Sequence, residues 1–320
     1  MRPPARCDYR RLHRRRRRTT LQAQSDGAQK DTVTAGVIGL GMIGGGVARN
    51  IAAAGLPLTV YDIRPDAADG LDGVAAPLGS PADVARASDV VLISVVDAGQ
   101  VREVLTGEGG VFGAGKQGLV VLLLSTVALS AVREFTALCA GQGATLLDAG
   151  VTQAGDGLLV SMVGGPTDIV ERVRPVLDAF SKAVVHCGPV GSGMVTKIAR
   201  NVVTYASWAV VREATGMAVR AGVDPERLIE VLDTAVTGGT SPLFLLRDHL
   251  DTQGVIRRQA AYIEALAQKD LAAAQELGRE IGLATPVVDT VRPWMSAVLE
   301  GKYEGTAVGS TPRKTGGHDS

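Results

Sequence analysis

The 320-residue sequence is poor in aromatic residues and in cysteine, and both shortages limit what the protein can be. Aromatic residues make up only 3% of the chain, so its core must be packed by the aliphatic side chains that dominate a 46% hydrophobic content. The three cysteines, Cys7, Cys139 and Cys187, show neither metal-ligand nor CxxC spacing. A sparse, odd set favours free thiols in a reducing compartment, so we expect a cytoplasmic protein.

Long apolar runs are also missing. The longest, around residues 118–132, is interrupted by Ser125, Thr126 and Ser130 and is too short to span a bilayer. It fits a buried strand that leads into a turn. We therefore expect no membrane partner.

The formal net charge is zero, but the basic residues are unevenly distributed. Residues 1–30 contain nine Arg and one Lys against two acidic residues, which leaves 23 basic and 31 acidic residues in the remainder, a net charge of about −8. An acidic body weighs against nucleic acid as a partner. We expect residues 1–32 to form a disordered basic extension, with a transit peptide or a nucleic-acid-binding arm as alternatives.

Short apolar runs alternate with helical patterns between residues 33 and 189, whereas the pattern from residue 190 to residue 305 is almost wholly helical. The alternation predicts a Rossmann-type α/β domain with a doubly wound, mainly parallel sheet, and the second pattern an all-α C-terminal domain. The Gly-, Ser- and Thr-rich residues 306–320 are expected to be a disordered tail. The expected strands are Val33–Ile38, Leu58–Tyr61, Val90–Val96, Leu119–Leu124, Thr145–Leu147, Leu159–Val163 and Ala183–Val185. The expected helices include Ala98–Leu105, Leu129–Ala140, Thr167–Phe180, Met194–Ala221, Pro225–Thr234, Leu243–Leu250, Gln259–Gly282 and Pro286–Glu300.

A glycine motif, Gly39-Leu40-Gly41-Met42-Ile43-Gly44, follows the first expected strand and opens a helix. In that position it predicts a dinucleotide-binding turn, in which backbone approaches the pyrophosphate closely and the helix N-terminus faces the phosphates. Asp62 ends the next strand, where its carboxylate would bind the adenosine ribose hydroxyls and repel a 2′-phosphate. NAD is therefore favoured, although Arg64, two residues beyond Asp62 and separated from it by Ile63, keeps NADP possible. A glycine turn without a cofactor and FAD binding are the alternatives.

Lysine is scarce, with only seven of the 33 basic residues, and Lys197 lies in the expected helix Met194–Ala221. A partly buried lysine can release its proton near neutral pH, whereas arginine cannot, so Lys197 is a candidate general acid or base. Asn201 lies one turn further along the same face and would orient substrate or ammonium through its amide. The alternative is that Lys197 lies on a solvated helix face.

The histidines do not indicate a metal site. His186 and His249 have no carboxylate or cysteine partner at metal-ligand spacing. We therefore expect both to be structural.

Further motifs follow the glycine turn in a characteristic order. They are Asp89–Val96, Ser125–Thr126, Met162–Gly165, Gly188–Asn201, Ala221–Asp224 and Lys269–Leu271. Over residues 33–300 this order resembles the β-hydroxyacid dehydrogenase family, typified by 3-hydroxyisobutyrate dehydrogenase and tartronate semialdehyde reductase. The resemblance implies an NAD(P)-dependent oxidoreductase that transfers hydride between nicotinamide and a small β-hydroxyacid or its semialdehyde.

The family's catalytic helix is similar to Gly188–Asn201, which implies that Lys197 is the catalytic acid/base and Asn201 its partner. The resemblance also favours a homodimer or homotetramer, as does the 28-residue helix Met194–Ala221, which is too long for a small domain to cover. The cofactor contacts that it implies are Val95, Val96, Gln100, Thr126 and, from the helical domain, Lys269.

One segment departs from the family pattern. After Asp148-Ala149 the family has Pro-Val-Ser-Gly-Gly, which holds the substrate carboxylate, whereas this chain has Gly150-Val151-Thr152-Gln153-Ala154. Thr152 keeps a hydroxyl, but Gln153 and Ala154 bring side chains where glycines allow close approach. We expect these three residues to contact a substrate that binds differently. An imine reductase, which shares the two-domain plan but usually lacks the lysine, and a non-catalytic nucleotide-binding protein are the alternatives.

Overall fold

The computed structural model describes residues 33–154, 156–236, 255–300, 302–303 and 306–307. The chain divides into two compact units, Met1–Lys197 and Ile198–Ser320, which are described separately. The boundary between these units falls inside a helix, between residues 197 and 198. No helix within the described ranges is both long enough and apolar enough to cross a membrane.

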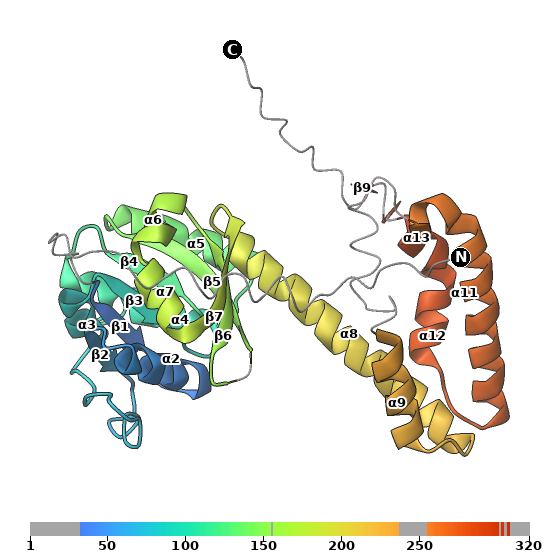
Figure 1. The fold of residues 1–320 in the computed structure, drawn as a ribbon. Helices are drawn as coiled ribbons and strands as arrows, with labels where there is room; N and C mark the ends of the chain where they lie inside the picture. Colours follow the sequence, from blue (N-terminus) through green and yellow to red (C-terminus); the bar gives the residue numbers. More distant parts are fainter. Residues whose placement is uncertain (1–32, 155, 237–254, 301, 304–305, 308–320) are drawn as a thin grey trace, which may run out of the picture. The chain divides into compact units, whose positions relative to one another are not determined.

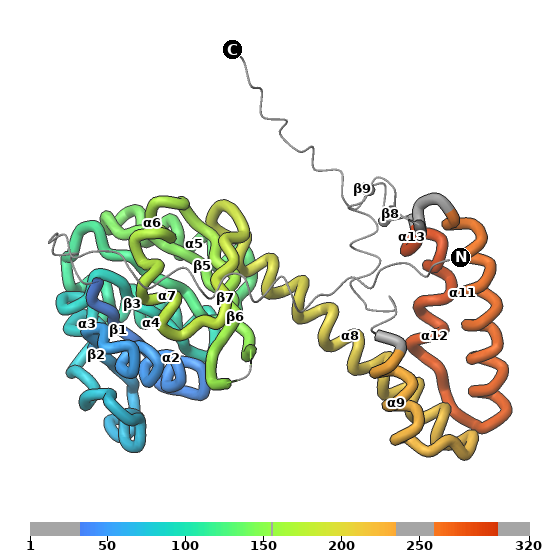
Figure 2. Tube along the Cα trace, in the orientation of Figure 1, coloured from blue at the N-terminus to red at the C-terminus, as the bar shows by residue number. Residues whose placement is uncertain are grey.

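A seven-stranded sheet forms the centre of the first unit (Figures 1 and 2). Its order is β2-β1-β3-β4-β5-β6-β7, and every neighbouring pair is parallel except β5 and β6. The predicted doubly wound, mainly parallel sheet is therefore confirmed. The strands are β1 (Ala35–Ile38), β2 (Leu58–Tyr61), β3 (Val90–Ile93), β4 (Val120–Leu123), β5 (Thr145–Gln153), β6 (Leu159–Gly164) and β7 (Ser181–Gly188).

Several elements differ from the sequence-based expectation: β3 ends at Ile93 instead of Val96, and β7 covers Ser181–Gly188 instead of Ala183–Val185. Strand β5 continues to Gln153 instead of ending at Leu147, because residues 148–153 pair with β6 in an antiparallel hairpin. The single helix expected over residues 167–180 is two helices, α6 (Thr167–Arg172) and α7 (Arg174–Phe180). Pro175 lies in the first turn of α7, where its missing N–H is tolerated but would interrupt a continuous helix.

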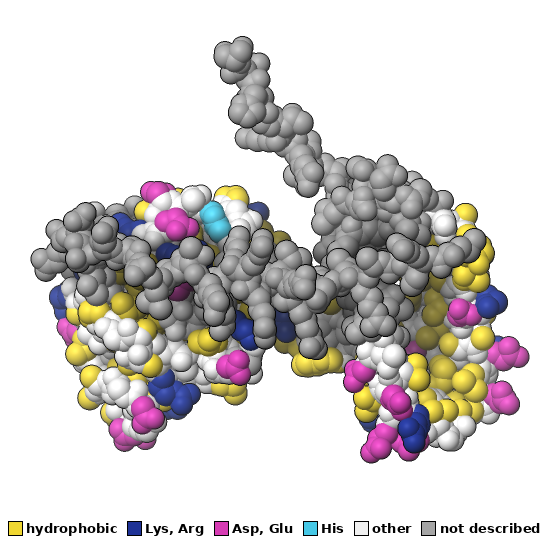
Figure 3. Space-filling model, in the orientation of Figure 1, with side chains coloured by type: hydrophobic (Ala, Val, Ile, Leu, Met, Phe, Trp, Pro, Cys, Tyr) yellow, Lys and Arg dark blue, Asp and Glu magenta, His cyan; other side chains and the backbone are white. Residues whose placement is uncertain are grey.

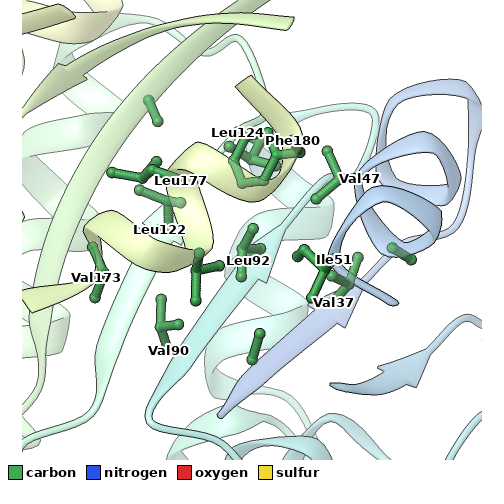
Figure 4. Packing of buried hydrophobic residues seen from close by; sticks show 14 of the residues in the cluster. Val37, Val47, Ile51, Val90, Leu92, Leu122, Leu124, Val173, Leu177 and Phe180 are labelled. Atoms are coloured by element: carbon green, nitrogen blue, oxygen red, sulfur yellow. The ribbon is translucent and has the colours of Figure 1, made fainter. Parts of the chain in front are cut away.

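Successive residues of the central strands face opposite sides of the sheet, so each strand contributes side chains to two hydrophobic cores. Val90 and Leu92 belong to the core under α2 (Met42–Ala53) and α7, whereas Val91 and Ile93 belong to the core on the other face. Figure 4 shows the first core, with Leu177 and Phe180 of α7 over Leu92, Leu122 and Leu124, and Ile51 of α2 beside Val37. The second core is covered by α3 (Pro81–Ala87), α4 (Ala98–Thr106), η1 (Val111–Ala114) and α5 (Leu129–Gly141).

Cys139 of α5 lies in the second core, and its burial raises the pKa of the thiol to about 12. Cys187, on β7, is half-buried, and both residues are free thiols, as expected. The imidazole Nε2 of His186 lies 2.9 Å from the carbonyl oxygen of Gly165 and 3.1 Å from that of Gly188. These contacts join the ends of β6 and β7 and agree with a structural role for His186.

The second unit is mainly helical, as predicted. The expected helix Pro286–Glu300 is broken into three segments around Pro293, and Thr306, expected to begin a disordered tail, instead lies in a two-residue strand. The expected helix over residues 243–250 with His249, the basic extension and residues 308–320 lie outside the described residues. The elements are α8 (Ser192–Arg220), which begins in the first unit, α9 (Pro225–Val236), α11 (Val255–Glu280), α12 (Pro286–Val291), η2 (Arg292–Trp294), α13 (Met295–Glu300), β8 (Lys302–Tyr303) and β9 (Thr306–Ala307).

The fold predicts a sharp dependence on side-chain volume at Leu92, which is fully buried at the centre of the sheet. Leu92→Ala should lower the free energy of unfolding by about 2–5 kcal/mol, because it removes buried methyl groups and leaves a cavity. Leu92→Met keeps the volume and should cost less than about 1.5 kcal/mol. Urea unfolding followed by circular dichroism measures both, and equal losses in the two variants would contradict the packing described here.

Candidate active site

A cavity of about 530 Å³ opens in the first unit beyond the carboxyl ends of β1, β2 and β3. Ligands of doubly wound sheets bind at this edge. Five of its lining residues were not predicted from the sequence: Ile38, Tyr61, Ser94, Glu103 and Val104. The ten predicted residues that it brings together are Gly39, Gly41, Met42, Ile43, Asp62, Ile63, Arg64, Val95, Val96 and Gln100.

The three glycines of the turn serve two different purposes. Gly39 has a φ of +89°, and a Cβ there would collide with the carbonyl oxygen of Ser94. A Cβ at Gly44 would collide with the carbonyl oxygen of Gly39, so both residues allow the turn to pack against its own fold. A Cβ at Gly41 would meet no protein atom within 4 Å, so this glycine leaves open space beside the helix N-terminus.

The N-terminus of α2 fits a phosphate group. Its capping position, Gly41, provides no side-chain hydrogen bond, and the first turn contains no acidic residue. The first N–H groups of a helix lack intrahelical partners and carry a partial positive charge, which favours an anion. The open space at Gly41 and these donors together suit the pyrophosphate of a dinucleotide.

Asp62 connects the glycine turn to the end of β2. Its Oδ2 accepts the backbone N–H of Leu40 at 2.7 Å, so Leu40 fixes the carboxylate although it does not line the cavity. Its Oδ1 accepts the backbone N–H of Arg64 at 2.9 Å and the Arg64 Nε at 3.0 Å. Burial by itself raises the pKa of Asp62, but the hydrogen bonds from Arg64 and Leu40 outweigh it and hold the pKa below its ordinary value. The carboxylate is therefore charged at neutral pH.

The backbone after β3 is held by two side chains. The hydroxyl of Ser125 accepts the N–H of Val95 at 2.9 Å and donates to its carbonyl oxygen at 2.8 Å, and Gln100 Oε1 accepts the N–H of Val96 at 3.0 Å. Ser125 was not predicted as a site residue, although its position directly after a buried strand could have indicated that its hydroxyl binds nearby backbone. Thr126, the next residue, is exposed and does not line the cavity.

Lys197 lies in the first part of α8 and is half-buried. A Cβ at Gly150 would collide with the Cβ of Lys197 and lie 3.0 Å from its Cγ, so the aliphatic stem rests on the bare backbone of β5. Asn201 lies one turn further along α8, where its Oδ1 accepts a hydrogen bond of 3.3 Å from Arg200. Asn201 and Lys269 belong to the second unit, in which Lys269 Nζ forms an exposed ion pair of 3.2 Å with Asp270.

The hairpin that follows Gly150 presents its side chains alternately to the two faces of the sheet. Because Gly150 faces Lys197, Thr152 lies on the Lys197 side of β5, and Ala154 follows the last residue of the strand. Gln153 lies on the opposite side, where it lines a smaller cavity of about 240 Å³ with Met42 and Ile43 of α2. The structure therefore places Gln153 and Thr152 on opposite faces of β5.

Asp148 is the residue that sequence reasoning missed most clearly. It is fully buried at the centre of β5. Its Oδ1 accepts the N–H of Gly191 and its Oδ2 the N–H of Met194, both at 2.6 Å. An acidic residue within an apolar strand could have indicated a structural role, since a buried carboxylate requires hydrogen-bond donors. Its partners, however, lie more than 40 residues away in the sequence.

Both parts of the chain match models of known families. Residues 34–188 match the NAD binding domain of 6-phosphogluconate dehydrogenase, and residues 191–308 match the NAD-binding region of NADP-dependent 3-hydroxyisobutyrate dehydrogenase. A probable mitochondrial 3-hydroxyisobutyrate dehydrogenase of Dictyostelium discoideum is 32% identical over 78% of this chain and 80% of its own. The 2-hydroxy-3-oxopropionate reductase of Escherichia coli K12 is 33% identical over 78% of this chain and 86% of its own.

Solved structures of oxidoreductases are also similar to this chain. A putative oxidoreductase from Mycobacterium avium 104 is 30% identical, with a TM-score of 0.72 over 83% of this chain and 98% of that one. An imine reductase from Myxococcus stipitatus has a TM-score of 0.69 over 84% of this chain and 94% of that one, but at 18% identity it supports the fold alone. The chain belongs to the β-hydroxyacid dehydrogenase family of NAD(P)-dependent oxidoreductases, as its motifs predicted.

Proposed function

We propose that this protein transfers hydride between a nicotinamide cofactor and a small β-hydroxyacid or its semialdehyde, with Lys197 as general acid and base. The observation that carries the proposal is the position of Lys197. Its stem lies on Gly150 of β5, in the same unit as the cavity formed around the glycine turn and Asp62. The relatives named 3-hydroxyisobutyrate dehydrogenase and 2-hydroxy-3-oxopropionate reductase support this substrate class.

The nicotinamide, when bound, supplies or accepts the hydride. In reduction, the Lys197 ammonium gives a proton to the carbonyl oxygen as the carbonyl carbon receives hydride, and the lysine is left as a neutral amine. In oxidation, the neutral amine takes the hydroxyl proton as the carbon loses hydride. Asn201 orients the reacting oxygen or Nζ through its amide, and Lys269 is proposed as a cofactor contact, as the family resemblance implies.

The substrate carboxylate is proposed to bind at Thr152, whose hydroxyl lies on the Lys197 face of β5. Ala154, the next residue after the strand, is proposed as a further substrate contact. Gln153 extends from the other face toward α2, so its amide is better placed to act near the cofactor side of the site. This arrangement gives the loop one anion-binding hydroxyl on the substrate side.

NAD is the proposed cofactor in preference to NADP. Asp62 is charged, lines the cavity and neutralises Arg64, the nearest cation on that strand end. Glu103 adds a second carboxylate to the cavity wall. A 2′-phosphate would meet these carboxylates, whereas the ribose hydroxyls would donate hydrogen bonds to Asp62.

The protein is also proposed to act as a cytoplasmic homodimer or homotetramer. The helical unit exposes large apolar side chains on α8, among them Val202 at 63% and Trp208 at 65% exposure, with Tyr205 packed edge-on against Trp208. Figure 3 shows further hydrophobic side chains at the surface of this unit, over α9 and α11. Exposed apolar patches of this kind mark interfaces, and a second copy of the chain is the proposed partner.

Lys197→Ala should lower kcat by about 10²–10⁴-fold, because it removes the proton donor, while the affinity for NADH stays near the wild-type value. The measurement is NADH formation from a panel of small β-hydroxyacids, with NADH binding followed by fluorescence. Lys116→Ala is the matched control, since Lys116 contacts the Ser88 carbonyl and Asp89 at the amino end of β3. Normal turnover in Lys197→Ala would exclude the proposed role, and turnover of cyclic imines alone would favour an imine reductase.

Asp62→Ser should raise the ratio of kcat/KM for NADP to that for NAD by at least about ten-fold, equivalent to about 1.4 kcal/mol. The change removes a charge that repels the 2′-phosphate and releases Arg64 to bind it. The double variant Asp62→Ser, Arg64→Ala is the control and should lose the gain. An unchanged ratio in the single variant would contradict the role assigned to Asp62.

Sedimentation equilibrium should show a dimer or tetramer for the wild type, and Trp208→Glu should shift it toward the monomer, because it places a charge on the apolar face of α8. Arg227→Glu changes an exposed α9 residue that pairs with Glu230 and should leave the mass unchanged. A stable, fully active wild-type monomer would rule out the proposed assembly.

A further inference from the structure

Helix α8 begins against strands β5 and β6 so closely that there is no room for side chains between them. A Cβ at Gly193 would collide with the carbonyl oxygen of Met162 and lie 2.6 Å from that of Asp148. At Gly150 a Cβ would collide with the Cβ of Lys197. The first turns of α8 therefore rest directly on strand backbone, and small displacements of either element move Lys197.

The carboxylate of Asp148 holds the helix in that position. Its two oxygens accept the N–H groups of Gly191 and Met194, which lie on either side of the first residue of α8, Ser192. These donors have no intrahelical partner, and the helix dipole adds to their attraction for a negative charge. Two bonds to residues three apart fix both the depth and the rotation of the helix start.

The carboxylate is itself enclosed. A Cβ at Gly164, its partner across the β5–β6 pairing, would collide with Asp148 Oδ1 and lie 2.8 Å from the carbonyl oxygen of Pro189. Asp148 is fully buried, so it contacts neither cofactor nor substrate. Any effect of this residue on catalysis must therefore act through α8.

We propose that Asp148 and Gly150 are positioning residues for Lys197. Asp148 fixes the start of α8 one turn before Lys197, and Gly150 provides the surface on which the stem of Lys197 lies. Together they determine where Nζ meets the substrate oxygen. This inference rests on the proposed function of Lys197.

The first test is Asp148→Asn, which replaces one acceptor oxygen by an N–H₂ group that opposes a backbone N–H. The expected result is a loss in kcat of about 10²-fold, the effect of a displacement near 1 Å, with NADH affinity near the wild-type value. The matched control is Asp89→Asn, because Asp89 Oδ2 likewise accepts a backbone N–H, that of Thr34, at the opposite edge of the same sheet. The control should keep the wild-type kcat.

The second test is Gly150→Ala, which leaves every hydrogen bond of Asp148 in place. Gly150 does not have a positive φ, so alanine is allowed by the backbone, and its Cβ would collide with the stem of Lys197 and lie 3.1 Å from the carbonyl oxygen of Gly193. Gly150→Ala should lower kcat and leave NADH affinity near the wild-type value. Gly141→Ala, at a position where a Cβ meets no atom within 4 Å, is its control and should be neutral.

A double-mutant cycle separates positioning from general stability. In the Lys197→Ala background, Asp148→Asn and Gly150→Ala should cause no further loss of kcat, because no ammonium remains to be displaced. The inference is overturned if either variant lowers kcat by the same factor with and without Lys197, or if both keep the wild-type kcat. If Asp148→Asn fails to bind NADH, Gly150→Ala decides the question alone.

The proposed function fails separately from this inference. Wild-type turnover in Lys197→Ala would exclude the acid/base role itself. Loss of turnover in Lys197→Ala together with wild-type kcat in Asp148→Asn and Gly150→Ala would exclude only the positioning role.

Discussion

The hydrogen bonds between the Asp148 carboxylate and the start of α8 are the constraint on which the site depends. A buried charge is costly unless it is fully hydrogen-bonded, so the strand can hold this carboxylate only where donors are supplied. The N-terminus of α8 supplies two. The start of α8 thus donates the hydrogen bonds that the buried carboxylate requires, and the carboxylate in turn fixes the start of α8. Lys197 follows one turn later.

On the cofactor side, the Asp62 carboxylate also accepts backbone N–H groups, but its surroundings differ from those of Asp148. Asp62 also accepts a backbone N–H from a distant segment, that of Leu40 in the glycine turn. Its carboxylate, however, lines the cavity, whereas that of Asp148 is enclosed by α8 and β6. Both carboxylates order the backbone around them, but only Asp62 keeps an edge available to a ligand. This difference is why we propose Asp62 as a binding residue and Asp148 as a residue that acts through the helix it holds.

The sequence predicted those parts of the fold that are encoded locally. The continuously buried apolar run of β3, the glycine turn with its positive φ at Gly39, and Asp62 at the end of β2 are each specified by a few neighbouring residues. The partners of Asp148 are 43 and 46 residues away, and the contact between Gly150 and Lys197 depends on the packing of a helix on a strand. Neither the hydrogen bonds of Asp148 nor the contact between Gly150 and Lys197 could be found without the three-dimensional structure.

The departures of the β5 segment from the family motif become understandable when its two faces are separated. Gly150 lies under Lys197, where the family's proline would bring a Cβ into the stem, so glycine at this position and the close approach of α8 belong together. Thr152 continues that face, whereas Gln153 points toward α2. The amide of Gln153, which the sequence predicts to contact the substrate, thus lies on the opposite face from Lys197. This is why we propose the hydroxyl of Thr152 as the group of the hairpin that meets a substrate anion on the Lys197 face.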